Sequence, residues 1–454
     1  MRVPAPSGRD PGPAVAASGD ARGAVDRYFS LTARGSTWRR EVLAGASTFM
    51  ALSYIVVVNP AVLAQGGIPR SAAFVATAVI GGLATVAMGL WARLPFAVAP
   101  GMEMNTIVAV SVVGLLGYTW PQALGMVFWS GVAMLVVSAM RLRQAVIDAI
   151  PAEAKPALTA AVGVFIGLVG LQIAGVLRSS DGHLSGFGDL ASPHAWAAYL
   201  GLGTALLVDR LGGRSVAALA GIAVAALHLT VQGEAEGPGR FDPGDGLAAL
   251  FRFDLGVITD ARAWSVILVL FALDFFGSIA KVVGLSNRTP LQDGEGGVPG
   301  MRQALFTDAG ATVAGSAAGS SSFVVFVESA VGIRAGARTG IAAVVTGVLL
   351  LTCLVLGPVL TYIPVTATTG TLLFVAVKMV TGSRPREERG LHWAVTGTAV
   401  AATVATLAID QAMAAAFLVC LVADVTARRR PHPVLLVTTA LLTGSIIVQY
   451  LSPA

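Results

Sequence analysis

GSSSFVVFVE (319–328) and AVAPGMEMNT (97–106) are two stretches interrupted by Gly or Pro, each with one carboxylate, in an otherwise strongly apolar chain. Of its 454 residues, 55% are hydrophobic and only 12% are charged. Apolar windows of about 17 to 25 residues recur along almost the whole chain, and a helix needs this length to cross the hydrocarbon core of a bilayer. The composition therefore predicts a polytopic membrane protein.

The apolar windows predict fourteen membrane-spanning segments in two sets of seven. We place the first set at 43–65, 72–92, 97–117, 121–142, 156–177, 193–210 and 212–232. We place the second set at 261–285, 301–317, 319–334, 336–360, 365–382, 391–409 and 411–427. The last apolar stretch, 434–451, either lies along the membrane interface or forms a further span.

Basic residues in the connections predict the orientation. Arg34, Arg39 and Arg40 precede the first segment, and Arg141 and Arg384 follow segments 4 and 12. Because cytoplasmic loops are enriched in Lys and Arg, we expect a multi-pass protein of the cell membrane with a cytoplasmic N-terminus. Residues 1–36 are rich in Pro, Gly, Ala and Ser and predict a disordered cytoplasmic tail.

Several function classes are disfavoured by the sequence. The formal charge of +5 comes from loops between apolar windows rather than from one basic face, so no nucleic-acid partner is expected. Cys353 and Cys420 both lie in apolar windows and indicate neither a disulfide framework nor a zinc site. No metal-ligand spacing, phosphate loop or nucleophile elbow is present, so we expect no metal and no cofactor, and a membrane enzyme is a remote alternative.

The two interrupted stretches open segments 3 and 10, which hold equivalent positions in the two sets of seven. Broken helices at matching positions of two repeats indicate the substrate site of a secondary transporter. Irregular backbone at membrane depth persists only where protein or a water-filled cavity satisfies its N–H and C=O groups. The predicted fold class is an all-α integral membrane protein, with short broken helices or strand-like stretches in segments 3 and 10.

Three carboxylates in predicted spans are candidates for the chemistry, Glu103, Asp274 and Glu328. A charge at the bilayer centre costs about 2.5 to 3.5 kcal/mol on insertion scales, so an acid there usually has a function. A buried carboxyl group can carry a coupling proton, or its oxygens can accept N–H groups of a polar heterocycle. The sequence does not distinguish between these uses.

Other side chains of the same segments complete the candidate site. Asn105 offers a donor and acceptors to the same cavity. Phe326 and Phe275 could stack on a flat ligand, although Phe in a spanning helix usually serves packing.

Four stretches in order carry a resemblance to a known family: ASTFMALSYIVVVNPAVLAQGGIP (46–69), APGMEMN (99–105), the run from TWPQALGMVFWSGVAM to AIPAEAKPALTAAVGVFIGLVGL (119–171) and FVESAVGIRAGARTG (326–340). Over residues 36–380 the chain resembles the purine permeases of the nucleobase-ascorbate transporter superfamily, and within it the adenine-guanine-hypoxanthine branch. This resemblance implies fourteen segments in two inverted seven-helix repeats, and proton-driven transport of hypoxanthine, guanine, adenine or xanthine by an elevator-like motion. It also implies a possible homodimer.

The resemblance further implies a division into a core domain that holds the substrate and a gate domain. The expected boundaries are 1–36 for the tail, 37–145 and 261–360 for the two parts of the core, and 146–260 and 361–454 for the two parts of the gate.

By position, Asn105 matches the asparagine of segment 3 in the family, Asp274 an acid of segment 8, and Glu328 the glutamate of segment 10 that binds the base. Glu103 stands where the family usually has Gly, and Phe271 stands where a second acid of segment 8 is usual. We therefore hypothesise that Glu103 replaces the lost acid, and Asp274, Glu328 and Glu103 all remain candidates for proton coupling.

Further departures concern the surroundings of these acids. Phe275 replaces a Thr, and Val324, Val325 and Phe326 replace a Thr-Thr-Tyr triplet. These changes from polar to apolar leave open an alternative, a transporter of the same fold for another small heterocycle or an anion.

Overall fold

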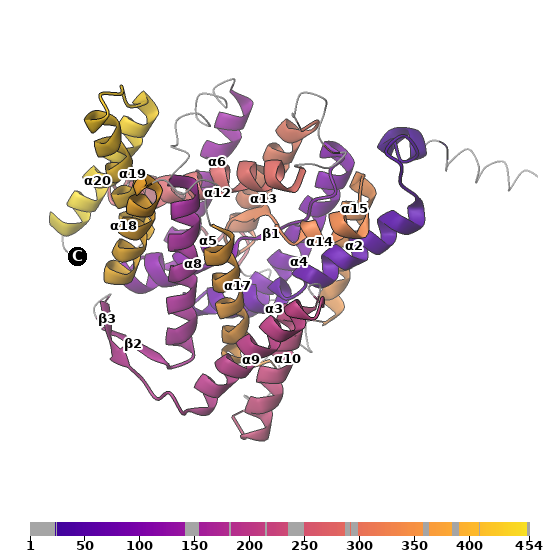
Figure 1. Ribbon diagram of the computed structural model, residues 1–454, viewed down its shortest axis with the longest axis horizontal. Coiled ribbons are helices and arrows are strands. Elements are labelled where there is room, and N and C mark those ends of the chain that lie inside the picture. Colours follow the sequence, from indigo (N-terminus) through magenta and orange to yellow (C-terminus); the bar gives the residue numbers. More distant parts are fainter. Residues whose placement is uncertain are drawn as a thin grey trace, which may run out of the picture.

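The computed structural model describes residues 23, 25–140, 154–180, 183–213, 216–234, 249–286, 291, 298–356, 363–383, 390–407 and 409–451. Most of the predicted tail, together with Arg141 and Arg384 of the predicted orientation, lies outside the described residues. The described chain is mostly helical, as Figure 1 shows.

The first half of the chain forms the following elements: α2 (Trp38–Leu52), α3 (Ile55–Gln65), α4 (Arg70–Ala87), η1 (Met88–Ala92), β1 (Val98–Pro100), α5 (Met102–Thr106), η2 (Ile107–Leu115), α6 (Trp120–Ala139), α8 (Ala154–Ile173), β2 (Leu177–Ser180), β3 (His183–Phe187), α9 (Pro193–Arg210) and α10 (Ala217–Val231). The second half forms η3 (Leu255–Thr259), α12 (Ala263–Ser286), α13 (Met301–Ala317), β4 (Phe323–Val325), α14 (Ser329–Ala335), α15 (Gly340–Thr352), η4 (Cys353–Leu356), η5 (Val365–Thr368), α17 (Thr369–Gly382), α18 (Gly390–Thr406), α19 (Ile409–Thr426) and α20 (Pro433–Leu451).

Helices occupy the apolar windows that hydropathy predicts. Among the described residues, six helices are long and apolar enough to cross a membrane, and other apolar helices are shorter. The first of the six, Trp38–Gln65, consists of α2, which ends at Leu52, and α3, which begins at Ile55, with a short turn between them. The stretch at 434–451 is the helix α20, which packs against α12 and α19. The chain is therefore a multi-pass membrane protein.

A β-hairpin follows α8 and was not anticipated by the helical prediction for 156–177. Helix α8 ends at Ile173, and Gly175 then adopts a left-handed backbone conformation with φ of 72°. The antiparallel strands β2 and β3 follow, with Leu177 paired to Phe187. Gly can adopt this conformation without steric cost, so it ends the helix before the predicted boundary.

The two interrupted stretches pair with each other inside the protein. Strands β1 and β4 are antiparallel, with Val98 opposite Val325 and Pro100 opposite Phe323. The amide of Phe326 donates to the carbonyl of Ala97, and the amide of Gly101 donates to the carbonyl of Ser322, both at 2.9 Å. The strand-like character predicted for segments 3 and 10 is confirmed, and the paired backbones satisfy each other away from water.

The helices fall into two groups that pack mainly within themselves. In the first group, α2 contacts α14 and α15, α4 contacts α3, α13 and α15, and α6 contacts α12 and α13. In the second group, α8 contacts α17, α18 and α19, and α9 contacts α10 and α17. The strand β1 contacts α3, α4 and β4 of the first group, and Figure 1 shows it near the middle of the molecule.

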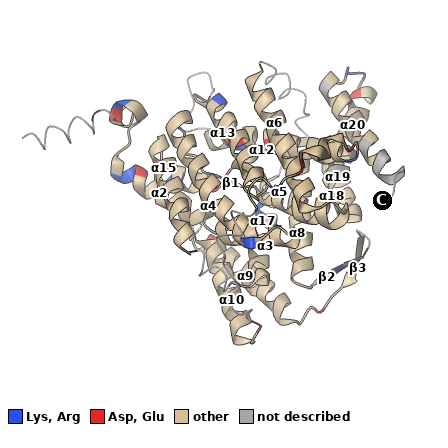
Figure 2. Ribbon diagram, turned by 180° about the vertical axis from the view of Figure 1, so that it is seen from behind, with Lys and Arg blue, Asp and Glu red and all other residues tan. Residues whose placement is uncertain are grey.

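Charged residues are sparse along the helices, as Figure 2 shows. Large apolar side chains are instead exposed on the outside, among them Leu83, Trp91 and Val348 on α4, η1 and α15. Exposure of this kind suits a surface that faces lipid tails rather than water.

Glycines allow α4 with η1 to approach α15 closely. A Cβ atom at Gly347 would lie 2.5 Å from the carbonyl oxygen of Gly82 and 2.8 Å from Val86 Cγ2. Gly89 and Gly340 face each other in the same way. Small residues at helix contacts let backbones approach, and this packing replaces the hydrophobic effect that is missing between helices in lipid.

We predict that Gly347→Ala destabilises the protein by about 1 to 3 kcal/mol, because the added methyl group overpacks the α4–α15 contact. The measurement is the midpoint of thermal unfolding in detergent. Gly397→Ala on α18 is the matched control, because a Cβ there meets nothing within 4 Å and Ala favours helix over Gly. Equal midpoints for the two variants would contradict this account of the contact.

Candidate functional site

A cavity of about 520 Å³ lies between the two groups of helices. One wall comes from the end of α2 and the α2–α3 turn, α5, α12, β4 and the connection from β4 to α14, and the other comes from α8, α10 and α17. Most lining residues are apolar, and the polar or charged ones are Tyr54, Glu103, Thr159, Lys281, Glu328 and Lys378. An apolar pocket of this size with a few convergent polar groups is typical of a small-molecule site.

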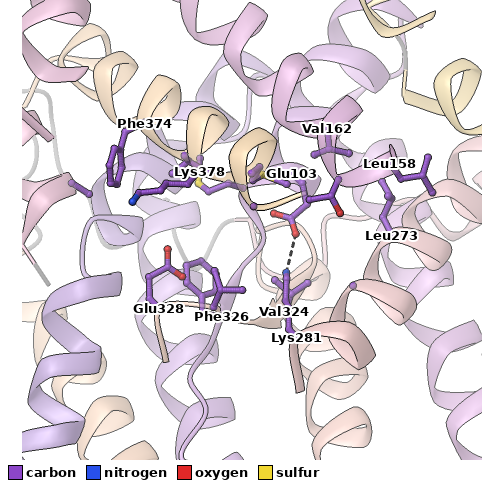
Figure 3. A pocket seen from close by; sticks show the side chains of 18 of the residues that line it. Glu103, Leu158, Val162, Leu273, Lys281, Val324, Phe326, Glu328, Phe374 and Lys378 are labelled. Atoms are coloured by element: carbon purple, nitrogen blue, oxygen red, sulfur yellow. Dashed lines mark hydrogen bonds and ion pairs between the residues drawn. The ribbon is translucent and has the colours of Figure 1, made fainter. Parts of the chain in front are cut away.

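Glu328 lines this cavity at the point where the backbone leaves β4 and enters α14. The side chain takes this position because β4 ends at Val325 and α14 begins at Ser329. The hydroxyl of Tyr54 donates a hydrogen bond to Glu328 Oε1 at 2.9 Å. Phe326 lines the cavity beside it, as Figure 3 shows. This arrangement holds one carboxylate oxygen and presents the group to a ligand next to an aromatic face.

Glu103 lies in the first turn of α5 and forms an ion pair across the cavity wall with Lys281 of α12. Lys281 Nζ is 3.0 Å from Glu103 Oε1. The side chains of Lys281 and Glu103 are 19% and 17% exposed, respectively. Figure 3 shows the two groups pointing toward each other. The added acid is therefore balanced by a cation that the sequence reasoning did not single out.

Asp274 lies behind the cavity wall and is 1% exposed. Its Oδ2 accepts hydrogen bonds from Thr312 Oγ1, at 3.0 Å, and from Ser322 Oγ. The Thr312 hydroxyl also accepts from the Phe323 amide at 3.1 Å. Asp274 does not line the cavity, and these bonds connect α12, α13 and the start of β4.

Asn105 is likewise fully buried, and its Oδ1 accepts a hydrogen bond from Ser321 Oγ. Asn59 makes the neighbouring bond to Ser320 Oγ at 3.2 Å. The serines before β4 thus tie this stretch to α3, α5 and α12. Asn105 is part of this buried layer rather than of the cavity lining.

The two predicted aromatic residues separate in the structure. Phe326 lines the cavity, whereas Phe275 is fully buried. Phe275 stacks on Phe271, with ring centroids 5.5 Å apart. The structure therefore brings Glu103, Glu328 and Phe326 together at the cavity and places Asp274, Asn105 and Phe275 outside its lining.

Four residues of this region were not anticipated: Tyr54, Lys281, Thr312 and Lys378. Lys281 follows Asp274 by two helical turns in a predicted span, and a charge in a span is a signal of function that could have found it. Lys378 lines the cavity from α17 and pairs with Asp209 of α9 at 2.5 Å. Tyr54 and Thr312 carry no comparable signal, because their partners are distant in sequence.

Asp308 is a further buried acid, on α13, and it interacts electrostatically with Asp274 and Lys281. The part of the chain that the structure describes holds no group of three or more His, Cys, Asp or Glu residues that could bind a metal ion.

Comparison with known proteins defines the family. The family Xan_ur_permease, described as "Permease family", matches residues 39–386. The chain belongs to this permease family. It lies in the nucleobase-ascorbate transporter superfamily, in the branch of adenine and guanine/hypoxanthine permeases, and this permease is a transport protein rather than an enzyme.

Individual relatives cover most of the chain. The permease is 33% identical over 360 residues to the adenine permease AdeQ of Escherichia coli (strain K12), covering 79% of this chain and 80% of AdeQ. It is 30% identical to the guanine/hypoxanthine permease PbuO of Bacillus subtilis (strain 168), covering 78% of this chain and 84% of PbuO.

Solved structures share the fold at low identity. The transmembrane domain of the cyanobacterial bicarbonate transporter BicA aligns with a TM-score of 0.60 and 15% identity, covering 83% of this chain and 96% of that domain. The murine anion transporter Slc26a9, in its inward-facing state, aligns with a TM-score of 0.63 and 10% identity, covering 94% of this chain and 77% of that protein.

We predict that Thr312→Val destabilises the permease by about 1 to 3 kcal/mol, because it leaves buried hydrogen-bonding groups of Asp274 and Phe323 without this partner. The shape of the side chain is conserved, so packing changes little. Thermal unfolding in detergent measures the effect.

Thr398→Val on α18 is the matched control for this substitution, since the Thr398 hydroxyl bonds only to a carbonyl of its own helix, that of Ala394 at 2.8 Å. Should Thr312→Val unfold at the same temperature as Thr398→Val, the hydrogen bonds around Asp274 would not stabilise the strand pair as described.

Proposed function

We propose that this permease is a secondary active transporter of purine nucleobases, driven by proton symport. The observation that carries the proposal is a carboxylate, Glu328, presented beside Phe326 in a cavity at the paired strands between two groups of helices. Support comes from relatives that are named adenine and guanine/hypoxanthine permeases.

The chemistry of the cavity suits a flat heterocycle with N–H groups. Tyr54 holds Glu328 Oε1, so the other oxygen can accept a ring N–H of a base. The ring of Phe326 supplies a face on which a base can stack. Asp274 and Asn105 act behind this contact by fixing the start of the strand that precedes Glu328.

Proton coupling requires a carboxylate whose charge can be removed during transport. Lys281 balances Glu103, so protonating Glu103 would leave an unpaired cation at the cavity. Asp274 and Glu328 accept hydrogen bonds from neutral hydroxyl groups instead. We therefore place the coupling proton on Asp274 or Glu328, and retain Glu103 as a ligand-binding group.

The proposed architecture has fourteen segments in two inverted seven-helix repeats. The first group of helices corresponds to a core domain (37–145 and 261–360), and the second corresponds to a gate domain (146–260 and 361–454). Transport then moves the core against the gate like an elevator and carries the cavity across the membrane. The N-terminus is cytoplasmic, and two copies of the permease can form a homodimer.

A second candidate is transport of a small anion. Two lysines, Lys281 and Lys378, line the cavity, and two solved structures that share the fold are a bicarbonate transporter and an anion transporter. Each of these lysines already pairs with an acid, Glu103 or Asp209, so the cavity has no unbalanced lysine among its lining residues. This charge balance favours the purine.

Uptake of labelled hypoxanthine into proteoliposomes with an imposed inward proton gradient tests the function. We expect uptake that collapses when the gradient is removed and that is competed by purines but not by bicarbonate or sulfate. Glu328→Gln should reduce uptake about 10- to 100-fold, because it replaces a charge-assisted hydrogen bond that contributes about 1.5 to 3 kcal/mol.

Glu234→Gln is the control substitution, because the Glu234 side chain is exposed, lies 3.9 Å from His194 and does not line the cavity. Competition by small anions with no effect of purines would favour the second candidate. Wild-type uptake by Glu328→Gln would refute the role of this carboxylate.

A further inference from the structure

The Glu103–Lys281 ion pair needs an explanation beyond stability. Both side chains line the cavity and are partly exposed to it. Replacing a desolvated ion pair with apolar residues of similar volume is often neutral or stabilising. The charges of a pair that only filled space at membrane depth would therefore add nothing to the stability of the protein. The pair lies on the cavity wall instead, where its charges can contact a ligand.

The pair offers two complementary groups side by side. Lys281 Nζ carries three donors, one of which points to Glu103 Oε1 at 3.0 Å. The carboxylate of Glu103 keeps acceptor sites for a second donor. A ligand edge with an acceptor next to a donor can thus bind both groups at once, and charge-assisted hydrogen bonds of this kind are the strong ones.

We propose that the Glu103–Lys281 pair recognises the lactam edge of an oxopurine, and this inference rests on the proposed function. Lys281 donates to the exocyclic carbonyl oxygen, and Glu103 accepts the adjacent ring N–H. Hypoxanthine and guanine carry this edge. The substrate class is therefore the 6-oxopurines, with Glu328 holding a second N–H of the same base.

Adenine matches the pair only when the base is turned over. Its amino group would then face Glu103 and its ring nitrogen would face Lys281. Figure 3 shows Glu328 to one side of the pair. Turning the base changes the position of its imidazole N–H, so an N–H that meets Glu328 in one orientation does not meet it in the other. A site built to hydrogen-bond a polar group discriminates strongly against a ligand that lacks it in that position.

Equilibrium binding of labelled hypoxanthine to the purified permease, competed by hypoxanthine, guanine, adenine and 1-methylhypoxanthine, tests the inference. Wild type should bind the two oxopurines at least about tenfold more tightly than adenine. The N1-methyl group removes the donor for Glu103, so 1-methylhypoxanthine should also bind at least about tenfold more weakly. This arm needs no substitution and is independent of whether a variant folds.

The double variant Glu103→Gln/Lys281→Met removes both charges together and leaves no lone ion. We expect it to lose the preference for oxopurines over adenine. Asp260→Asn/Arg262→Met is the control, because it removes an ion pair of 3.5 Å that lies just before the start of α12 and away from the cavity. The control variant should keep the wild-type ratio of oxopurine to adenine affinity.

The outcomes separate the two levels of the argument. Three results would show that the inference about the ion pair is wrong while purine transport stands. They are that 1-methylhypoxanthine binds as tightly as hypoxanthine, that adenine binds most tightly of the purines, or that the double variant keeps the wild-type ratio of oxopurine to adenine affinity. If no purine displaces the label and none is taken up, the proposed function itself is wrong.

Discussion

The pairing of β1 with β4 is the constraint on which the rest of the structure depends. Two interrupted segments carry extended backbone into the interior of a membrane protein, where water does not satisfy N–H and C=O groups. Each strand satisfies the other, and the hydroxyl of Thr85 adds bonds of 2.9 Å to both the amide and the carbonyl of Val98. Because α5 follows β1 and α14 follows β4, this pairing sets Glu103 and Glu328 at the same cavity.

Polar groups around the strands form two layers with different tasks. In the inner layer, Asp274, Asn105 and Asn59 bond to Ser322, Ser321 and Ser320, respectively. In the outer layer, Glu328, Glu103 and Lys281 face the cavity. The inner layer fixes the backbone that the outer layer presents, as required for a site whose groups are held in place before the ligand arrives.

The sequence predicts the helices and the breaks of this fold well, for physical reasons. Apolar windows of spanning length and the Gly and Pro residues before Glu103 and Glu328 are local signals, and helices and strands form where they occur. The hairpin after α8 is not predicted by these local signals, because Gly175 ends the helix inside an apolar window.

The partners within the site were less predictable, because they depend on contacts between distant segments. Glu103 and Lys281 are 178 positions apart, and Tyr54 and Glu328 are 274 apart. Hydropathy ranks Asp274 and Glu328 alike as acids within spans, yet one is enclosed by hydroxyl groups and the other lines the cavity. Only the packing of the strands against α12 and α13 separates them.

Photo-crosslinking with a radiolabelled azidopurine, followed by mapping of the labelled peptides, tests the central claim most directly. The account predicts labelling around Glu103 and around Phe326 to Glu328, abolished by excess unlabelled hypoxanthine. Labelling that purines do not compete, or competed labelling confined to peptides away from the paired strands, would contradict the claim that this cavity is where the permease binds a purine.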